Sequence, residues 1–385
     1  SDSTMYSDIH ADTLFTDQIP YQRRDLIEKD SVLVDSVWQY PAPDTIWTDT
    51  TYIQIRAYDN VRIYREDMQC VCDSAHYNGR DSIATLCGDP VCWNESNQVS
   101  SDTIRVYIKN GEVDYEAFAA LVDRQVEAGI DFLVPLGTTG ETPCLEDDER
   151  IKVLQIAKEH SQGRPIVVGG GTNSLQHTIR SMQMLEPYGV DAFLIVVPYY
   201  NKPTQEGQYQ YFKAVAEATQ KPIVLYNVPG RTGVNMTAET CLRLAQIPNI
   251  VAIKEASGNR EQIETILAGA PEGFQVLSGN DDDTLWMMKQ GGAGIISVAS
   301  NVAPGLLAEF TGAIRKGDME KAEALNEKLT PLFNNCFVES NPIPAKAAMH
   351  AMGLIENELR LPLVPSQQST YDLMVETIKD LGLIF

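Results

Sequence analysis

The sequence of 385 residues predicts an α/β fold, a (β/α)8 TIM barrel with a C-terminal helical extension, preceded by a smaller all-β N-terminal module. Two observations predict this division. Lys29 is the only lysine of residues 1–103, whereas the remainder is rich in Lys, Ala and Gly. Short alternating runs fill the first part, and apolar runs separated by helical segments fill the second. We therefore expect a β-rich module over 1–108, a catalytic barrel over 109–303 and the extension over 304–385.

The first part reads as short antiparallel strands. Residues 52–58 and 61–64 alternate between apolar and polar, with a turn expected at Asp59 and Asn60, and shorter runs follow at 70–72, 83–86 and 90–93. Regular short strands with turn signals between them are typical of an antiparallel sandwich or roll. These residues contain no recognisable set of nucleophile, base and orienting group, so we expect no chemistry here.

The second part has the alternation of buried strands and helices that is typical of a parallel barrel. The spacing predicts a first helix over 113–128 with Asp114 as its N-cap, and its apolar face consists of Phe118, Leu121, Val122 and Val126. Buried strands are expected at 131–136, 165–169, 192–197, 222–226, 250–254, 274–277 and 294–298. A barrel needs one strand more, and the candidate is 104–108, just before the first helix. Further helical segments at 304–316, 318–334, 342–353 and 369–381 form the extension, a natural surface for oligomers.

Charge and composition exclude several classes of function. The net charge of −23 argues against binding nucleic acid or anionic membranes, because phosphate affinity comes mainly from Lys and Arg. No apolar run is long enough to span a membrane, and no basic region followed by an apolar stretch begins the chain, so a cytoplasmic location is expected.

The cysteines favour no metal site. Cys70 and Cys72 alternate as in a strand, but a zinc site needs further ligands at matching spacing, and only His76 lies nearby. Ordinary free or buried thiols explain the seven cysteines, Cys70, Cys72, Cys87, Cys92, Cys144, Cys241 and Cys336, better.

The active site of such a barrel lies where its strands end. Lys254 finishes the apolar run of 251–253, and burial there favours the neutral amine, which can attack a carbonyl and form an imine. Tyr226 ends the neighbouring strand and could move protons. The alternatives are a lysine that reaches solvent and a tyrosine that packs on the rim.

Other polar side chains follow the strand ends. Thr138 and Thr139 could present hydroxyls and N–H groups to a carboxylate, or merely cap a helix before Glu141. Arg231 could grip a second carboxylate, or lie on the surface. The acidic run 280–283 reads as the capped first turn of a helix rather than a metal site.

Residues from about 111 to the C-terminus resemble the dihydrodipicolinate synthase family. The resemblance rests on motifs in the family's order and spacing: Gly137-Thr-Thr-Gly-Glu141, Pro198-Tyr-Tyr-Asn201, Tyr226-Asn-Val-Pro-Gly-Arg-Thr-Gly233, Ile253-Lys-Glu-Ala-Ser-Gly258 and Asn341-Pro-Ile-Pro-Ala-Lys346. It implies 4-hydroxy-tetrahydrodipicolinate synthase activity, the Schiff-base condensation of pyruvate with L-aspartate 4-semialdehyde in lysine and diaminopimelate biosynthesis. It implies no cofactor, because the lysine is itself the electron sink, and a homo-oligomer, a dimer or tetramer.

The resemblance also implies a role for each site residue. Lys254 is the Schiff-base lysine, and Thr138, Tyr226 and Tyr200 form a proton relay, Tyr200 coming from a neighbouring subunit. Thr138 and Thr139 also lie at the pyruvate carboxylate, and Arg231 binds the carboxylate of aspartate semialdehyde. Ile296 contacts pyruvate through its backbone, and Gly137 is a further substrate-binding residue. Sialic-acid lyases and sugar-acid aldolases share the lysine and tyrosine, but they usually lack the Arg-Thr-Gly element and the paired tyrosines.

The sequence departs from the family in two places. The first barrel strand is replaced by 102–111, with Arg105 and Tyr107 in place of apolar residues. The alternative to a barrel strand at 104–108 is that this segment is the last strand of the first module, which suggests a chimera joined near 109–111 that lacks the barrel's own first strand. Arg150 and His177 replace residues of the lysine-feedback site, which predicts weak sensitivity to lysine.

The first module resembles OstA-like β-jellyroll proteins of lipopolysaccharide transport. That resemblance covers roughly 10–108 and rests on short motifs, including Asn60-Val-Arg-Ile-Tyr64 and Gly88-Asp-Pro-Val-Cys-Trp93. The competing hypotheses for the chain are therefore a related pyruvate-dependent aldolase of the N-acetylneuraminate or sugar-acid type, and an inactive chimera whose N-terminal module binds lipid.

Overall fold

The chain divides into two compact units, Ser1–Glu112 and Val113–Phe385. The computed structural model describes residues 113–384 in full. In the first unit it describes the backbone of the strands, and side chains only at 71–76 and 86–88. Each unit is considered by itself.

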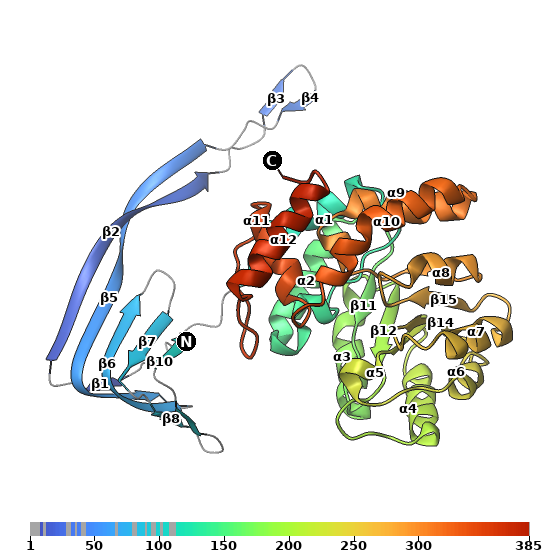
Figure 1. Ribbon diagram of the computed structural model, residues 1–385, viewed down its shortest axis with the longest axis horizontal. Coiled ribbons are helices and arrows are strands. Elements are labelled where there is room, and N and C mark those ends of the chain that lie inside the picture. The colour runs from blue at the N-terminus through green and yellow to red at the C-terminus, as the bar shows by residue number, and fades with distance from the viewer. Residues whose placement is uncertain are drawn as a thin grey trace. The chain divides into compact units, whose positions relative to one another are not determined.

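The first unit is an antiparallel sheet, as the alternation predicts (Figure 1). Its eight-stranded sheet has the central order β1-β5-β6-β7-β10, and β3 and β4 form a separate pair. The strands are β1 Asp8–His10, β2 Thr13–Ile27, β3 Val32–Val34, β4 Val37–Gln39, β5 Asp44–Arg65, β6 Met68–Asn78, β7 Ile83–Cys87, β8 Val91–Trp93, β9 Gln98–Ser100 and β10 Thr103–Tyr107.

The turn expected at Asp59 and Asn60 is wrong. These residues lie within the single strand β5, and the register against β6 shifts between Tyr58 and Val61. A bulge absorbs the extra residues, so the strand bends instead of reversing. A polar pair in an alternating run is compatible with a turn or with a bulge. Here β6 pairs with β5 on both sides of the polar pair, so the pair forms a bulge.

The second unit contains the parallel sheet of a (β/α)8 barrel. Six strands follow in the order β11-β12-β13-β14-β15-β16. They are β11 Val167–Gly169, β12 Ala192–Val196, β13 Ile223–Asn227, β14 Ile250–Glu255, β15 Gln275–Ser278 and β16 Gly294–Ile295. All six lie within or beside the predicted apolar runs.

The predicted strand at 131–136 lies beside β11 but forms only a few of the hydrogen bonds of a regular parallel strand pair. Leu133 pairs with Ile166, and the Val167 and Gly169 amides donate to the carbonyls of Leu133 and Pro135. Pro135 itself has no N–H to donate, so regular pairing cannot continue.

The candidate for the remaining barrel strand, 104–108, is wrong, and the alternative, that this segment is the last strand of the first module, agrees with the structure. Residues Thr103–Tyr107 form β10, which pairs antiparallel with β7 of the first unit, Ile104 lying opposite Leu86. Its alternation of apolar residues with Arg105 and Tyr107 suits a sheet with one covered face, whereas barrel strands are covered on both faces.

The barrel helices alternate with the strands (Figure 1). They are α1 Tyr115–Glu127, α2 Asp147–His160, α3 Leu175–Leu185, α4 Gln205–Glu217, α5 Pro229–Thr232, α6 Ala238–Leu244, α7 Arg260–Gly269 and α8 Thr284–Lys289. The Asp114 side chain caps α1 by accepting from the Ala117 amide at 2.9 Å, as predicted.

The C-terminal extension is helical, close to the predicted bounds. It comprises α9 Pro304–Lys316, α10 Met319–Asn335, α11 Ile343–Ala351 and α12 Gln368–Asp380, drawn in orange and red in Figure 1. Phe310, Phe333 and Met374 lie in its own apolar core. None of the helices in the described part of the chain is long and apolar enough to cross a membrane.

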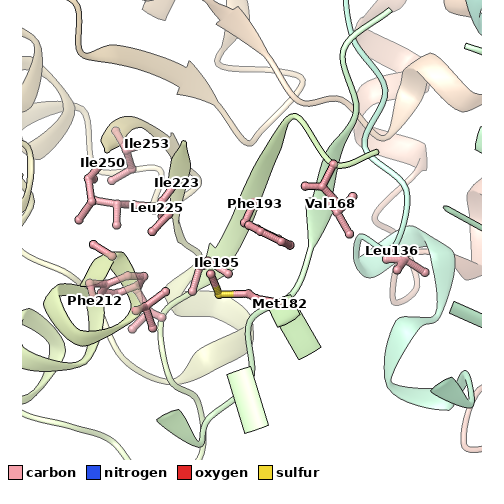
Figure 2. Close-up of a cluster of buried hydrophobic side chains, with 14 of the residues drawn as sticks. Leu136, Val168, Met182, Phe193, Ile195, Phe212, Ile223, Leu225, Ile250 and Ile253 are labelled. Atoms are coloured by element: carbon pink, nitrogen blue, oxygen red, sulfur yellow. The ribbon is translucent and has the colours of Figure 1, made fainter. Parts of the chain in front are cut away.

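Side chains of the barrel strands alternate between two cores. Phe193, Ile195, Leu225 and Ile253 pack toward the helices, in the cluster that Figure 2 shows with Phe212 of α4. The intervening residues, Val167, Leu194, Val224, Tyr226 and Ala252, join Ile296 in a second cluster, inside the barrel. Because successive strand residues face opposite sides, every second residue points inward.

A close backbone approach shapes the turn after the segment 131–136. Leu136 has a left-handed φ of 58°, and a Cβ on Gly169 would lie 1.8 Å from the Leu136 carbonyl oxygen. Only glycine at 169 leaves room for this turn, which leads directly into Gly137.

We predict that Gly169→Ala destabilises the barrel by about 2–4 kcal/mol, because backbone must move to admit the methyl group. The midpoint of thermal unfolding, followed by circular dichroism, should fall. The control is Gly312→Ala in α9, where an added Cβ meets nothing within 4 Å. That change should leave the midpoint unchanged or raise it. Equal midpoints for the two variants would contradict the prediction.

Candidate active site

Lys254 and Tyr226 lie side by side inside the barrel. They occupy matching positions in the parallel register of β14 and β13. The lysine Nζ lies 4.4 Å from the centroid of the tyrosine ring, and each residue is 9% exposed. A nucleophilic amine next to a phenol, both shielded from water, is an arrangement suited to imine formation with proton transfer.

Two buried carboxyl groups flank the lysine strand. Glu255 accepts from the Asn227 amide at 3.0 and 3.2 Å and from the Ser257 backbone amide at 2.7 Å. Asp281 accepts from the Ser297 hydroxyl and from the Val298 and Ala299 amides. Burial raises the pKa of both carboxyl groups, and the hydrogen bonds that each accepts oppose that rise.

The interpretation of residues 280–283 as the capped, acidic first turn of a helix is wrong, because α8 begins only at Thr284 and has no acidic residue in its first turn. Asp283 precedes α8 but makes no side-chain cap hydrogen bond. Asp281 instead turns into the interior and holds the segment that follows β16. The segment after β16 offers Asp281 three hydrogen-bond donors. A buried carboxyl group needs several partners, so Asp281 binds these donors and does not cap the helix.

The threonine turn lies at the start of a 3₁₀ helix. Gly137 is its N-cap, and Thr138–Gly140 form the single turn η1. The Thr142 hydroxyl donates to the Gly137 carbonyl at 2.9 Å, which fixes the turn from within. Neither threonine caps a regular α-helix. Both lie just after the barrel segment 131–136, at the rim of the barrel.

Arg231 and Thr139 are both held by one residue of the extension. Arg231, in the short helix α5, donates through Nη2 to the Asn341 carbonyl at 3.2 Å. The Asn341 amide nitrogen donates to the Thr139 hydroxyl at 3.0 Å. Thus the predicted residues fall into two groups, Lys254 with Tyr226, and Thr139 with Arg231.

Ile296 and Tyr200 differ sharply in exposure. Ile296 is buried, and its amide donates to the Ser278 carbonyl at 3.0 Å, so only its carbonyl can be offered to a ligand. Tyr200 has a φ of 70° and is 87% exposed, so it is not packed into the barrel of a single chain.

An ion-pair network anchors the segment that follows the threonine turn. Lys346 lies 2.7 Å from Glu141, whose other oxygen accepts from the Arg360 amide at 2.8 Å. The Arg360 guanidinium donates to both oxygens of Glu149 at 2.5 Å and to the Cys144 carbonyl at 2.8 Å. The C-terminal extension therefore grips both ends of residues 141–149.

Asp281, Glu255 and Asn341 were not among the predicted site residues. Glu255 is the last residue of β14 and Asp281 follows β15 by three residues, so the rule that sites lie at strand ends would have included both. Asn341 is far from any strand end in sequence, and only its place in the motif 341–346 pointed to it.

The comparisons with known proteins agree on one family. The Dihydrodipicolinate synthetase family matches residues 96–381. A protein from Thermotoga neapolitana named 4-hydroxy-tetrahydrodipicolinate synthase is 47% identical over 281 residues, which covers 72% of this chain and 96% of that protein. A protein of the same name from Phocaeicola vulgatus is 47% identical over 282 residues, covering 73% and 95%.

Solved structures give the same result. Dihydrodipicolinate synthase from Thermotoga maritima matches with a TM-score of 0.70 and 47% identity, covering 72% of this chain and 95% of that one. A chloride-inhibited dihydrodipicolinate synthase from Acinetobacter baumannii, in complex with pyruvate, matches with a TM-score of 0.70 and 42% identity over the same shares.

We predict that Arg360→Met lowers the thermal midpoint at pH 7 by several degrees, because Glu149 loses a paired charge worth about 1–3 kcal/mol. The hydrogen bond from Arg360 lowers the pKa of Glu149. The stabilisation is thus complete above the unfolded-state pKa of a glutamate and is lost as the pH falls through the lower folded-state pKa.

The difference between wild type and variant should therefore shrink toward acid pH. Arg315→Met is the control, because Arg315 pairs with Asp131 on the exposed surface and such pairs contribute little. If the difference in thermal midpoint between wild type and Arg360→Met stayed constant down to pH 3, the Arg360–Glu149 ion pair would not be the source of the stabilisation.

Proposed function

We propose that this chain, which belongs to the dihydrodipicolinate synthetase family, condenses pyruvate with L-aspartate 4-semialdehyde to give 4-hydroxy-tetrahydrodipicolinate. The observation that carries the proposal is the buried Lys254 amine 4.4 Å from the Tyr226 ring, at matching positions of adjacent strands. An enzyme of this kind is a lyase of the class I aldolase type, in which a lysine forms the imine.

The reaction follows ordinary imine chemistry. The Lys254 amine attacks the ketone of pyruvate, and loss of water leaves an imine. A proton leaves the methyl carbon to give an enamine, whose carbon attacks the aldehyde. The amino group of the second substrate then attacks the imine carbon, which closes the ring and releases the lysine. One water is lost overall, and the lysine returns to its starting state.

We assign the proton transfers to Tyr226, with Thr138 and Tyr200 completing the relay. The phenol of Tyr226 lies beside the amine and can give and take the protons of imine formation. The exposure of Tyr200 supports a role across a subunit boundary, because a tyrosine that acts in catalysis must be shielded from bulk water. The functional unit in this proposal is a homo-oligomer.

We assign the two substrate carboxylates to different parts of the rim. Thr138 and Thr139 receive the carboxylate of pyruvate, with Gly137 beside them, and the Ile296 carbonyl contacts the same substrate. Arg231 receives the carboxylate of aspartate semialdehyde. Its guanidinium uses Nη2 on Asn341 and has further donors for a bidentate contact. A carboxylate-bearing second substrate thus suits the site better than a neutral sugar end.

In this proposal 109–303 is the catalytic region and 304–385 the supporting extension. The OstA-like resemblance of the first unit, the cytoplasmic location and the weak sensitivity to lysine remain predictions.

We predict that reduction with borohydride in the presence of pyruvate modifies Lys254 alone, because reduction traps the imine. Peptide mass spectrometry locates the added mass. Lys254→Ala should abolish both the modification and the condensation. Lys289→Ala is the control, because that lysine pairs with Glu323 on the surface. Modification at another lysine, or none in the folded wild-type protein, would refute the proposed function.

We predict that Arg231→Ala raises the KM for aspartate semialdehyde about ten- to a hundredfold, the usual effect of losing a hydrogen-bonded charge. Trapping of pyruvate on Lys254 should persist, since the first half of the reaction does not use Arg231. Steady-state kinetics with each substrate varied separately would test this. Turnover of N-acetylneuraminate by the wild type, with none of aspartate semialdehyde, would favour the sugar-acid aldolase instead.

A further inference from the structure

The motif 341–346 has no role in the chemistry described so far, yet it begins with a buried polar residue. Asn341 is 4% exposed and lies in the extension, between α10 and α11. A buried amide that contributed only to packing would be costly, because its polar atoms need partners. Its partners are Thr139 and Arg231, which stand on two different loops of the barrel rim.

The contact with Thr139 determines what the threonine can offer. The Thr139 Oγ1 lies 3.0 Å from Nδ2 of Asn341 and 3.4 Å from its Oδ1. At the shorter distance the amide donates and the hydroxyl accepts. The hydroxyl also donates its own proton to Asn341 Oδ1 over the longer 3.4 Å. A carboxylate oxygen of a bound substrate would accept this proton in place of that long, weak contact.

The contact with Arg231 uses the backbone of the same residue. Nη2 of Arg231 donates to the Asn341 carbonyl at 3.2 Å. This bond fixes one corner of the planar guanidinium and so sets the direction of its remaining donors. Asn341 therefore acts on Thr139 through its side chain and on Arg231 through its main chain.

The rest of the motif keeps Asn341 in place. Lys346, one turn into α11, pairs with Glu141 at 2.7 Å, on the same loop that carries Thr139. The extension and the threonine loop are thus joined twice, and small movements of Asn341 relative to Thr139 are restricted.

We propose that Asn341 is a positioning residue that sets the donor direction of Thr139 and the orientation of Arg231, and so fixes the relative placement of the two carboxylate sites. The inference rests on the proposed function. It assigns to the extension a direct part in substrate recognition, in addition to packing against the barrel.

The test separates the side-chain contact from the backbone contact. Asn341→Ala should raise the KM for pyruvate about two- to tenfold, the effect of one lost hydrogen bond. The KM for aspartate semialdehyde should rise less, because the carbonyl that holds Arg231 remains. The isosteric Asn341→Asp should raise the KM for pyruvate further, because a carboxylate takes the Thr139 proton and repels the substrate.

A double-mutant cycle shows whether Asn341 acts through Thr139. Thr139→Val should itself raise the KM for pyruvate, and adding Asn341→Ala to it should cause no further rise. Asn335→Ala is the matched control, because that asparagine donates to Thr377 within the extension at 2.8 Å. It should leave both KM values unchanged.

The outcomes are distinct. Fold-changes in the pyruvate KM that multiply in the double variant, or unchanged KM values in Asn341→Ala and Asn341→Asp, would overturn the positioning role while leaving the function intact. A wild-type protein that traps no pyruvate on Lys254 would overturn the proposed function and this inference with it.

Discussion

The site depends on the two-residue period of barrel strands, combined with the register between two neighbours. Leu225 and Ile253 pack outward against the helices, so Tyr226 and Lys254 must point inward. The register then places them opposite each other. A slip of one residue in either strand would turn its reactive group toward the apolar layer under the helices. The packing of ordinary apolar residues thus fixes the positions of the amine of Lys254 and the phenol of Tyr226.

The rim of the barrel is held by a different kind of interaction. The residues 137–145 form short 3₁₀ turns with few buried apolar side chains, so the strand pattern does not fix them. Hydrogen bonds and ion pairs from Asn341, Lys346 and Arg360 supply the restraint. These partners lie about 200 residues later in the chain, which explains why the barrel motifs are accompanied by a helical extension.

The sequence predicted the features that depend on local patterns of apolar and polar residues. The apolar runs located the strands, and the rule that sites lie at strand ends found Lys254 and Tyr226. Prediction from the sequence failed where contacts with residues distant in the chain determine the structure. Residues 104–108 look like a usable strand, and only pairing with β7 excludes them from the barrel. The acidic run 280–283 looks like the first turn of a helix, and only the hydrogen-bond donors of Asp281, 16 to 18 residues later, show that this residue is buried in the interior. The part played by Asn341 required contacts that no spacing rule predicts.

These two kinds of restraint divide the work of the site. The barrel core fixes the amine and the phenol, which are needed for any reaction that proceeds through a lysine imine. In the proposed function the rim residues Thr139 and Arg231 select the substrates, and both are hydrogen-bonded to Asn341. On that proposal, changes in the extension alter which carboxylates are accepted and leave the imine chemistry in place. Changes in the alternation of β13 or β14 would remove the chemistry itself, whatever the rim could bind.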